Sequence, residues 1–197
     1  MNSLKLAVLA SVAFASSAFA QYRFDAATGD CRNAAGEQGL NAARGPCADL
    51  RGANLEGARF EAMDLRGARF DGAKLRGASF LQAELAGASF KGADLSKATL
   101  RGARLARANF AQAQLSGAHL EYARLEGAVL TDADLRNASL YKARFEGADV
   151  RGARFSQDRV LVDDAHWRGA IADVRTLPFT AAELASRHVT LDQVASR

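Results

Sequence analysis

Few residues in this 197-residue sequence belong to the types that commonly perform chemistry. The two cysteines, Cys31 and Cys47, have no histidine or further cysteine near them in sequence, whereas a metal site needs several such ligands. The three histidines, His119, His166 and His188, are widely spaced. The glycine pattern matches no nucleophile elbow, and neither a phosphate-binding loop nor a paired carboxylate site stands out. We therefore expect no catalytic residue, no metal site and no cofactor.

The first twenty residues have the features of a secretory signal peptide. Lys5 stands in a short basic region, an apolar stretch follows, and Ala18, Phe19 and Ala20 form an A-x-A cleavage site. We predict that residues 1–20 are removed, and that the mature chain begins at Gln21 in the periplasm or outside the cell.

An exported chain with two cysteines favours a disulfide between Cys31 and Cys47. A reactive or metal-binding pair is the alternative. The surrounding segment reads as a hairpin, with turn residues at Thr28, Gly29 and Asp30. We predict that residues 21–47 form a disulfide-linked N-terminal cap.

Most of the chain follows a period of five residues. Leucine, phenylalanine or, once, Val150 recurs at every fifth position from Leu50 to Phe155, which gives 22 centres. Alanine stands two residues before each centre except at Met63, and glycine is the commonest residue two positions after it. On a helix the centres would be scattered around its circumference, and on a flat strand successive centres would point to opposite faces of the sheet. A coil that turns a corner every five residues buries them all.

The stretch ADLRGANLEGARFEAMDLRGARFDGAKLRGASF, which begins at Ala48, resembles the pentapeptide repeat family, whose loose consensus is A(D/N)LXX. The resemblance covers about residues 48–157. It implies an all-β fold, a right-handed quadrilateral β-helix with four pentads in each coil. Some members of this family mimic DNA with acidic surfaces and inhibit topoisomerases. The formal net charge of +4 and the signal peptide argue against that role here.

With four pentads per coil, residues twenty apart stack in ladders inside the coil. Phe70, Phe90 and Phe110 should form one ladder, and Phe60 and Phe80 another on the opposite side. We expect these rings to be core and not a binding surface. Met63 is too large for its crowded inward position and should distort its coil locally.

The register breaks after Phe155, and it resumes two residues out of phase at Ala165 and Trp167. Thr180 and Glu183 form a capping-box pattern that predicts a short helix, and the residues from Thr190 to Gln193 suggest a second. We therefore predict a helical C-terminal cap over residues 158–197. The resemblance implies that this cap could mediate a homodimer.

Outward positions carry charges of both signs, and five arginines should share one side of the coil. A solvated ladder of ion pairs, with Glu126 and Glu146 beside the arginines, is one interpretation. The other is an anion-binding strip for lipopolysaccharide or nucleic acid, although interleaved acids argue against strong nucleic-acid binding. The five arginines are Arg101, Arg104, Arg107, Arg124 and Arg144.

These features predict an exported, non-catalytic scaffold or binding module with an unidentified protein or cell-envelope partner. No segment of the mature chain is expected to span a membrane. An effector or enzyme that uses the C-terminal segment is the alternative. A cleft that holds His166 with Asp163 and Asp164 would favour it.

Overall fold

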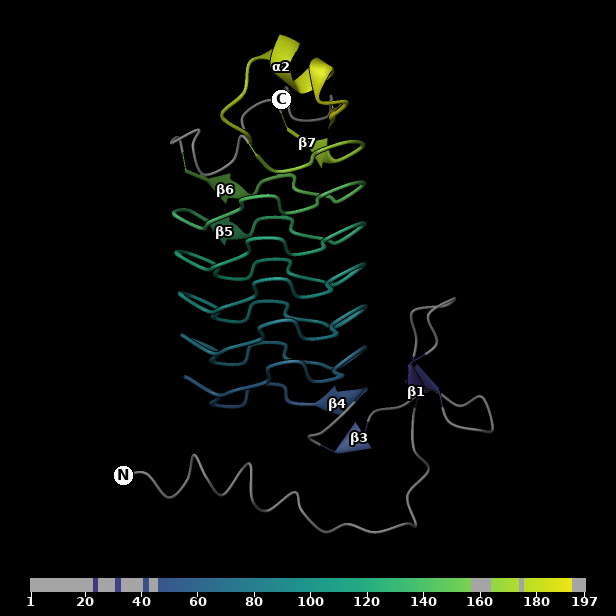
Figure 1. The fold of residues 1–197 in the computed structure, drawn as a ribbon, viewed down its shortest axis with the longest axis vertical. Coiled ribbons are helices and arrows are strands. Elements are labelled where there is room, and N and C mark those ends of the chain that lie inside the picture. The colour runs from purple at the N-terminus through teal and green to yellow at the C-terminus, as the bar shows by residue number, and fades with distance from the viewer. Residues whose placement is uncertain are drawn as a thin grey trace.

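The computed structural model describes residues 23–24, 31–32, 41–42, 46–156, 164–173 and 176–192. The predicted signal peptide and most of the predicted N-terminal cap lie outside the described residues. The larger part of the described chain is a rod of stacked coils (Figure 1).

Each pentad makes one side of a coil and ends in a tight turn. At the first complete turn, the backbone N–H of Ala53 donates to the carbonyl of Leu50 over 3.3 Å, and Gly52 between them has φ +63°. L-residues with a side chain rarely adopt this left-handed conformation, whereas glycine adopts it freely. The glycines two residues after the centres therefore mark the corners of the coil.

Successive coils are joined by parallel pairing between residues twenty apart, from Asp49 with Arg69 to Val129 with Asp149. A spacing of twenty residues in a five-residue repeat confirms four pentads per coil. The residue just before each centre makes the pairing, so a coil has four outer faces.

Continuous strands are only two residues long. β4 (Ala48–Asp49) pairs in parallel with β3 (Asn41–Ala42), and β5 (Asp134–Leu135) pairs in parallel with β6 (Arg154–Phe155). β1 (Arg23–Phe24) and β2 (Cys31–Arg32) are antiparallel, which confirms the predicted hairpin. The residues between β1 and β2 lie outside the described part.

The interior of the rod contains the side chains that the period predicted. All 22 centres are buried. Phe70 and Phe90 stack with ring centroids 4.9 Å apart, as do Phe90 and Phe110 and also Phe60 and Phe80. The two ladders meet edge to face across the coil, with Phe70 and Phe80 5.6 Å apart. The predicted aromatic ladders are therefore core, as expected.

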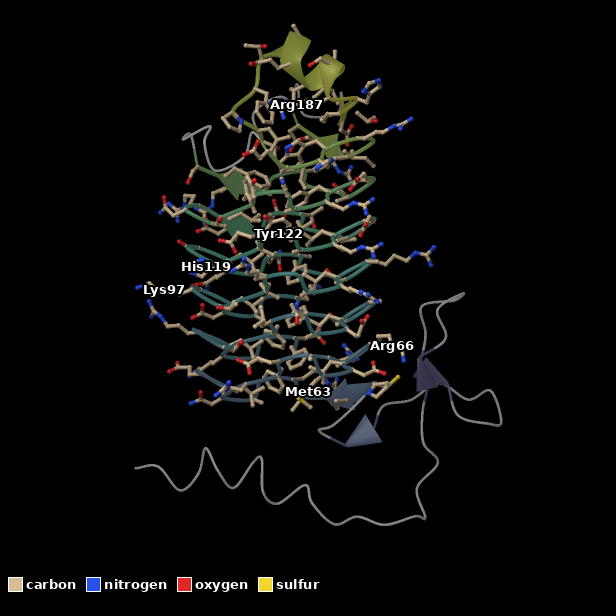
Figure 2. The ribbon with its side chains drawn as sticks, viewed as in Figure 1. Met63, Arg66, Lys97, His119, Tyr122 and Arg187 are labelled. Carbon is tan, nitrogen blue, oxygen red and sulfur yellow. The ribbon has the colours of Figure 1, made fainter. Side chains whose placement is uncertain are left out.

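The prediction that Met63 distorts its coil is wrong. The carbonyl of Met63 accepts a hydrogen bond from Glu84 over 2.9 Å, the same distance as between Lys74 and the carbonyl of Ala53. Met63 lies near one end of the rod (Figure 2) and is only partly buried. Because its side chain is not fully enclosed, the backbone does not have to move to accommodate it.

The resumed register after residue 163 is confirmed. His166 pairs with Arg144 and Ile171 with Asp149, in both cases 22 residues apart instead of twenty. Trp167 is 2% exposed and stacks on Phe145 with centroids 4.4 Å apart. It also contacts Phe155 and Phe179 edge to face, so it joins the last coil to the segment that follows.

The described part of the C-terminal segment contains one of the two predicted helices. α2 (Ala181–Ser186) begins at the capping box of Thr180 and Glu183, as predicted, and it lies over one end of the rod (Figure 1). The predicted start of the second helix is wrong: β8 (Thr190–Leu191) instead pairs in parallel with β7 (Ile171–Ala172), and residues 193–197 lie outside the described residues. The last coil presents a free backbone edge, and pairing with that edge outweighs a weak local helix signal.

Cys47 is fully buried. It occupies a corner position with φ +63°, and its N–H donates to the carbonyl of Arg66 over 2.8 Å, as at the other corners. The side chain of Cys31 lies outside the described residues. The bond between Cys31 and Cys47 therefore stays a prediction.

Candidate functional site

Three of the five arginines predicted to share one side form a column on a single outer face. Arg104 pairs with Arg124 and Arg124 with Arg144, with Glu84 before them and His166 after them. We call the face formed by these five residues the arginine face. The three arginine side chains are 45–60% exposed, so the face is open to solvent.

Glutamates lie between the stacked arginines, as the solvated-ladder interpretation predicted. Glu84 contacts Arg104 at 3.0 Å. Glu126 contacts Arg124 at 3.2 Å and Arg144 at 3.3 Å, and Glu146 contacts Arg144 at 3.2 Å. Each arginine of the column thus has a carboxylate partner, which reduces the repulsion between like charges stacked one coil apart.

The other two arginines flank this face. Arg101 and Arg107 are both exposed and occupy the turns before and after the pentad of Arg104. Arg107 has φ +58°, and the aliphatic part of its side chain lies close to Gly127 of the next coil. The five arginines therefore extend over one face and its two edges and do not form one straight strip.

An exposed aromatic pair lies beside Arg101 at the edge of the arginine face. Tyr122 is 44% and Tyr141 42% exposed, and their centroids are 5.5 Å apart at an interplanar angle of 85°. Sequence reasoning missed this pair. The five-residue register could have revealed it, because it places both tyrosines at outward turn positions of adjacent coils.

Aspartate–arginine pairs strengthen the other outer faces. Asp134 is the most enclosed of these carboxylates, with 11% of its side chain exposed, and it contacts Arg136 at 2.7 Å and Arg154 at 3.0 Å. Hydrogen bonds from Arg136 hold the pKa of Asp134 below its ordinary value, although burial acts in the opposite direction. The paired aspartate is therefore a charged structural group.

The histidines do not converge on a site. His119 contacts Glu121 at 3.4 Å on the face next to the arginine face, and Figure 2 shows it on the side of the rod. His166 is exposed at the end of the arginine column, and Asp163 lies outside the described residues. In the described part of the chain, no group of three or more His, Cys, Asp or Glu side chains could hold a metal ion.

Comparison with known proteins identifies the repeat. The family model for pentapeptide repeats matches residues 47–82, 83–121 and 118–157, which together exceed half of the chain. The chain therefore belongs to the pentapeptide repeat family. No curated protein matches it.

Several solved pentapeptide repeat structures are similar. Rfr23 from the cyanobacterium Cyanothece 51142 is 26% identical over 60% of this chain and 64% of its own, with a TM-score of 0.40. HetL from Nostoc sp. strain PCC 7120, which is involved in heterocyst differentiation regulation, is 30% identical over 66% and 67%, with a TM-score of 0.34. The plasmid-mediated fluoroquinolone resistance protein QnrB1 is 22% identical over 78% and 88%, with a TM-score of 0.41. The match thus spans less than two thirds of the length of Rfr23.

Proposed function

We propose that this protein is an exported, non-catalytic binding module that meets a cell-envelope partner through an outer face of its coil. The observation that carries the proposal is the division between the inside and the outside of the rod. Inward positions hold Leu, Phe and Ala packed against one another, and ion pairs occupy the outer faces. Recognition therefore has to come from side chains on those faces.

The arginine face is the surface that we assign to the partner. Its guanidinium groups are exposed and held in order by Glu84, Glu126 and Glu146. Ordered cations of this kind bind carboxylate or phosphate groups with less loss of side-chain freedom. The chain also carries a formal net charge of +4, or +3 once Lys5 is removed with the signal peptide, and this favours an anionic partner.

The test compares two triple variants of the purified mature protein in envelope extract. Arg104→Gln/Arg124→Gln/Arg144→Gln removes three charges from the arginine face. Lys74→Gln/Arg76→Gln/Lys97→Gln removes three exposed charges from the opposite side of the coil and is the matched control. We expect the first variant to lose the captured partner and the second to retain it. Equal capture by both variants, or no specific capture by the unmodified protein, would overturn the proposal.

Export and the N-terminal disulfide are parts of the same proposal. Cleavage after Ala20 predicts a periplasmic or secreted protein that begins at Gln21, and mass spectrometry of the intact purified protein tests this. A full-length chain found only in the cytoplasm would contradict it. In the described residues, no helix is long and apolar enough to cross a membrane.

The disulfide between Cys31 and Cys47 is expected to anchor the N-terminal cap to the first coil. Closing a loop of this length should stabilise the protein by roughly 3 kcal/mol. We predict that a reductant lowers the melting temperature and leaves the β-rich circular dichroism spectrum of the coil in place. Detection of two free thiols in native, unreduced protein would contradict this prediction.

A further inference from the structure

A second surface lies at the edge of the arginine face, where the chain turns from the face that carries His119 onto the arginine face. Successive coils place Arg101, Tyr122, Tyr141 and Lys142 at this turn, and we call these four residues the tyrosine edge. The coils are joined here by backbone hydrogen bonds, from Gly102 to the carbonyl of Glu121 and from Tyr122 to the carbonyl of Tyr141, both 2.9 Å. The four side chains are therefore held side by side along the rod.

Both cations of the tyrosine edge lie against aromatic rings. The Lys142 ammonium is 5.1 Å from the ring centroid of Tyr141 and 5.9 Å from that of Tyr122. The Arg101 guanidinium is 6.0 Å from the ring centroid of Tyr122. Contacts of this kind are weakly attractive and orient the side chains. The edge thus presents ordered positive charge next to exposed ring surface.

The two carboxylates nearest the tyrosine edge, Glu121 and Asp164, form no ion pair with Arg101 or Lys142 in the described part of the chain. Glu121 shares the turn with Tyr122, but it contacts His119 at 3.4 Å; burial raises the pKa of this carboxyl, and hydrogen bonds, among them one with Ser139, lower it below its ordinary value. Lys142 makes its main polar contact with the Tyr141 side chain, which raises the pKa of Lys142, and Asp164 of the next coil adds a smaller attraction. On the adjoining arginine face, by contrast, glutamates contact the arginines directly. The cations of the tyrosine edge are therefore available to an external anion.

We propose that the tyrosine edge binds an acidic glycan, a chain of sugar rings that carry carboxylate or sulfate groups. Sugar rings offer C–H surfaces for the tyrosine rings, hydroxyl groups for the phenol oxygens and anions for Arg101 and Lys142. The edge runs along the rod, so a linear polymer can contact several coils. The proposal specifies the ligand of the proposed binding module and rests on that function.

The geometry favours a glycan over single-stranded nucleic acid. Nucleobases bind protein surfaces by stacking flat on open aromatic faces. Here the two tyrosine rings stand nearly perpendicular to each other, and a cation lies within about 6 Å of the centre of each ring. Each ring thus already has a cation beside it, although 44% of Tyr122 and 42% of Tyr141 remain exposed.

The experiment measures binding of the mature protein to a heparin fragment and to single-stranded oligo(dT) by titration calorimetry at several salt concentrations. Arg101→Gln/Lys142→Gln removes the two cations of the edge. Arg76→Gln/Lys97→Gln removes two cations at equivalent turn positions on another corner, where Lys97 has φ +59° and Lys142 has φ +54°. Figure 2 shows Lys97 projecting from a different side of the rod than Tyr122. We expect the first variant to lose heparin affinity by about fivefold or more, with a weaker salt dependence, and the control to change little.

A second pair of variants separates the role of the rings from that of the charges. Tyr122→Asn/Tyr141→Ser removes both rings, and asparagine tolerates the left-handed conformation of residue 122, whose φ is +60°. Tyr122→Phe/Tyr141→Phe retains the rings. The first variant should lose several-fold affinity for heparin and the second should lose less. Trp167, the single tryptophan, is buried at the end of the coil, and its fluorescence reports whether each variant is folded.

Three results would overturn the inference. These are no heparin binding by the unmodified protein, equal losses in the edge and control variants, and oligo(dT) bound as tightly as heparin with the same dependence on the tyrosines. If the arginine-face variant still loses its envelope partner in any of these cases, the proposed function stands and only the glycan assignment falls. If, in addition, the arginine-face variant retains its envelope partner, the proposed function falls as well.

Discussion

At the scale of single residues, the sequence Asp-Leu-Arg or Asp-Val-Arg builds the same local contact at four places in the described coils. In each case the aspartate before the centre accepts hydrogen bonds from the arginine after it. At Asp49 and Arg51, for example, the two side-chain bonds are 2.8 and 2.6 Å long, and the backbone N–H of Arg51 also donates to Asp49 over 3.3 Å. The carboxylate thus satisfies a donor of the turn. The other three pairs are Asp64 with Arg66, Asp134 with Arg136 and Asp149 with Arg151.

The inward and outward register can be tested at neighbouring residues. Leu95 is fully buried between Leu75 and Leu115, so Leu95→Asp should cost at least about 3 kcal/mol or prevent folding. Asp94 faces outward and its carboxylate accepts a hydrogen bond from the N–H of Ser96 over 3.0 Å. Serine can supply a similar acceptor, so Asp94→Ser should change stability little. Urea denaturation measures both, and comparable losses would show that the register is wrong.

The pairing of Asp134 predicts a dependence of stability on pH. The folded pKa of Asp134 is lowered from 3.8, so its contribution is complete above the unfolded value and is lost as pH falls through the folded one. Asp134→Asn should therefore lower the free energy of unfolding by about 1–3 kcal/mol near neutral pH, and this difference should fade as the pH falls below 3.8 and through the lowered pKa of the folded state.

The same substitution at Asp49 serves as a comparison, because 34% of that side chain is exposed against 11% at Asp134. Solvent screening should make its effect smaller. Denaturant titrations across the acidic range measure both variants. A loss at Asp134 that does not vary with pH would show that packing, and not the charge, stabilises this position.

At the scale of elements, the pentads were predictable because one local rule repeats. Every centre from Leu50 to Phe155 is buried, and the phenylalanine ladders stack as the twenty-residue spacing requires. The capping box at Thr180 is also local, and α2 begins there. Thr190 and Leu191 were misassigned because their partner is the backbone of Ile171 and Ala172, which no local pattern reveals. The tyrosine edge was missed for a related reason: it depends on which corners of adjacent coils meet.

Corner glycines provide a prediction at this scale, because two of them differ only in their surroundings. Gly147 and Gly152 both have φ +68°. A methyl group at residue 147 would meet nothing within 4 Å, whereas at residue 152 it would overlap the Asp132 carboxylate. Gly147→Ala should cost about 1 kcal/mol for the left-handed backbone alone, and Gly152→Ala should cost more. Thermal denaturation in an Asp132→Gly background should abolish the difference, and equal costs in the original background would contradict the overlap.

At the scale of the whole molecule, each outer face is a set of columns in which residues one coil apart are neighbours. Placing like charges in one column would be unfavourable, since neighbouring strands lie only about 4.8 Å apart. The arginine face is ordered because acids from the turns lie between its cations: Glu126 contacts both Arg124 and Arg144. Stability and recognition are therefore coupled on this face, because the glutamates that order the arginines also compete with any anionic ligand.

This coupling predicts opposite effects of one double substitution. Glu126→Gln/Glu146→Gln should lower stability at low salt by less than about 1 kcal/mol per pair, and less at high salt, because exposed charges are screened. The same variant should bind heparin more tightly, since Arg124 and Arg144 lose their competing carboxylates. Glu56→Gln/Asp94→Asn makes the same change in net charge away from the arginine face and is the control. If heparin affinity rises equally in both variants, net charge alone explains the gain. If the first variant shows neither a salt-dependent loss of stability nor tighter binding, the arginines and glutamates do not act as one column, and the arginine face loses its claim as the binding surface.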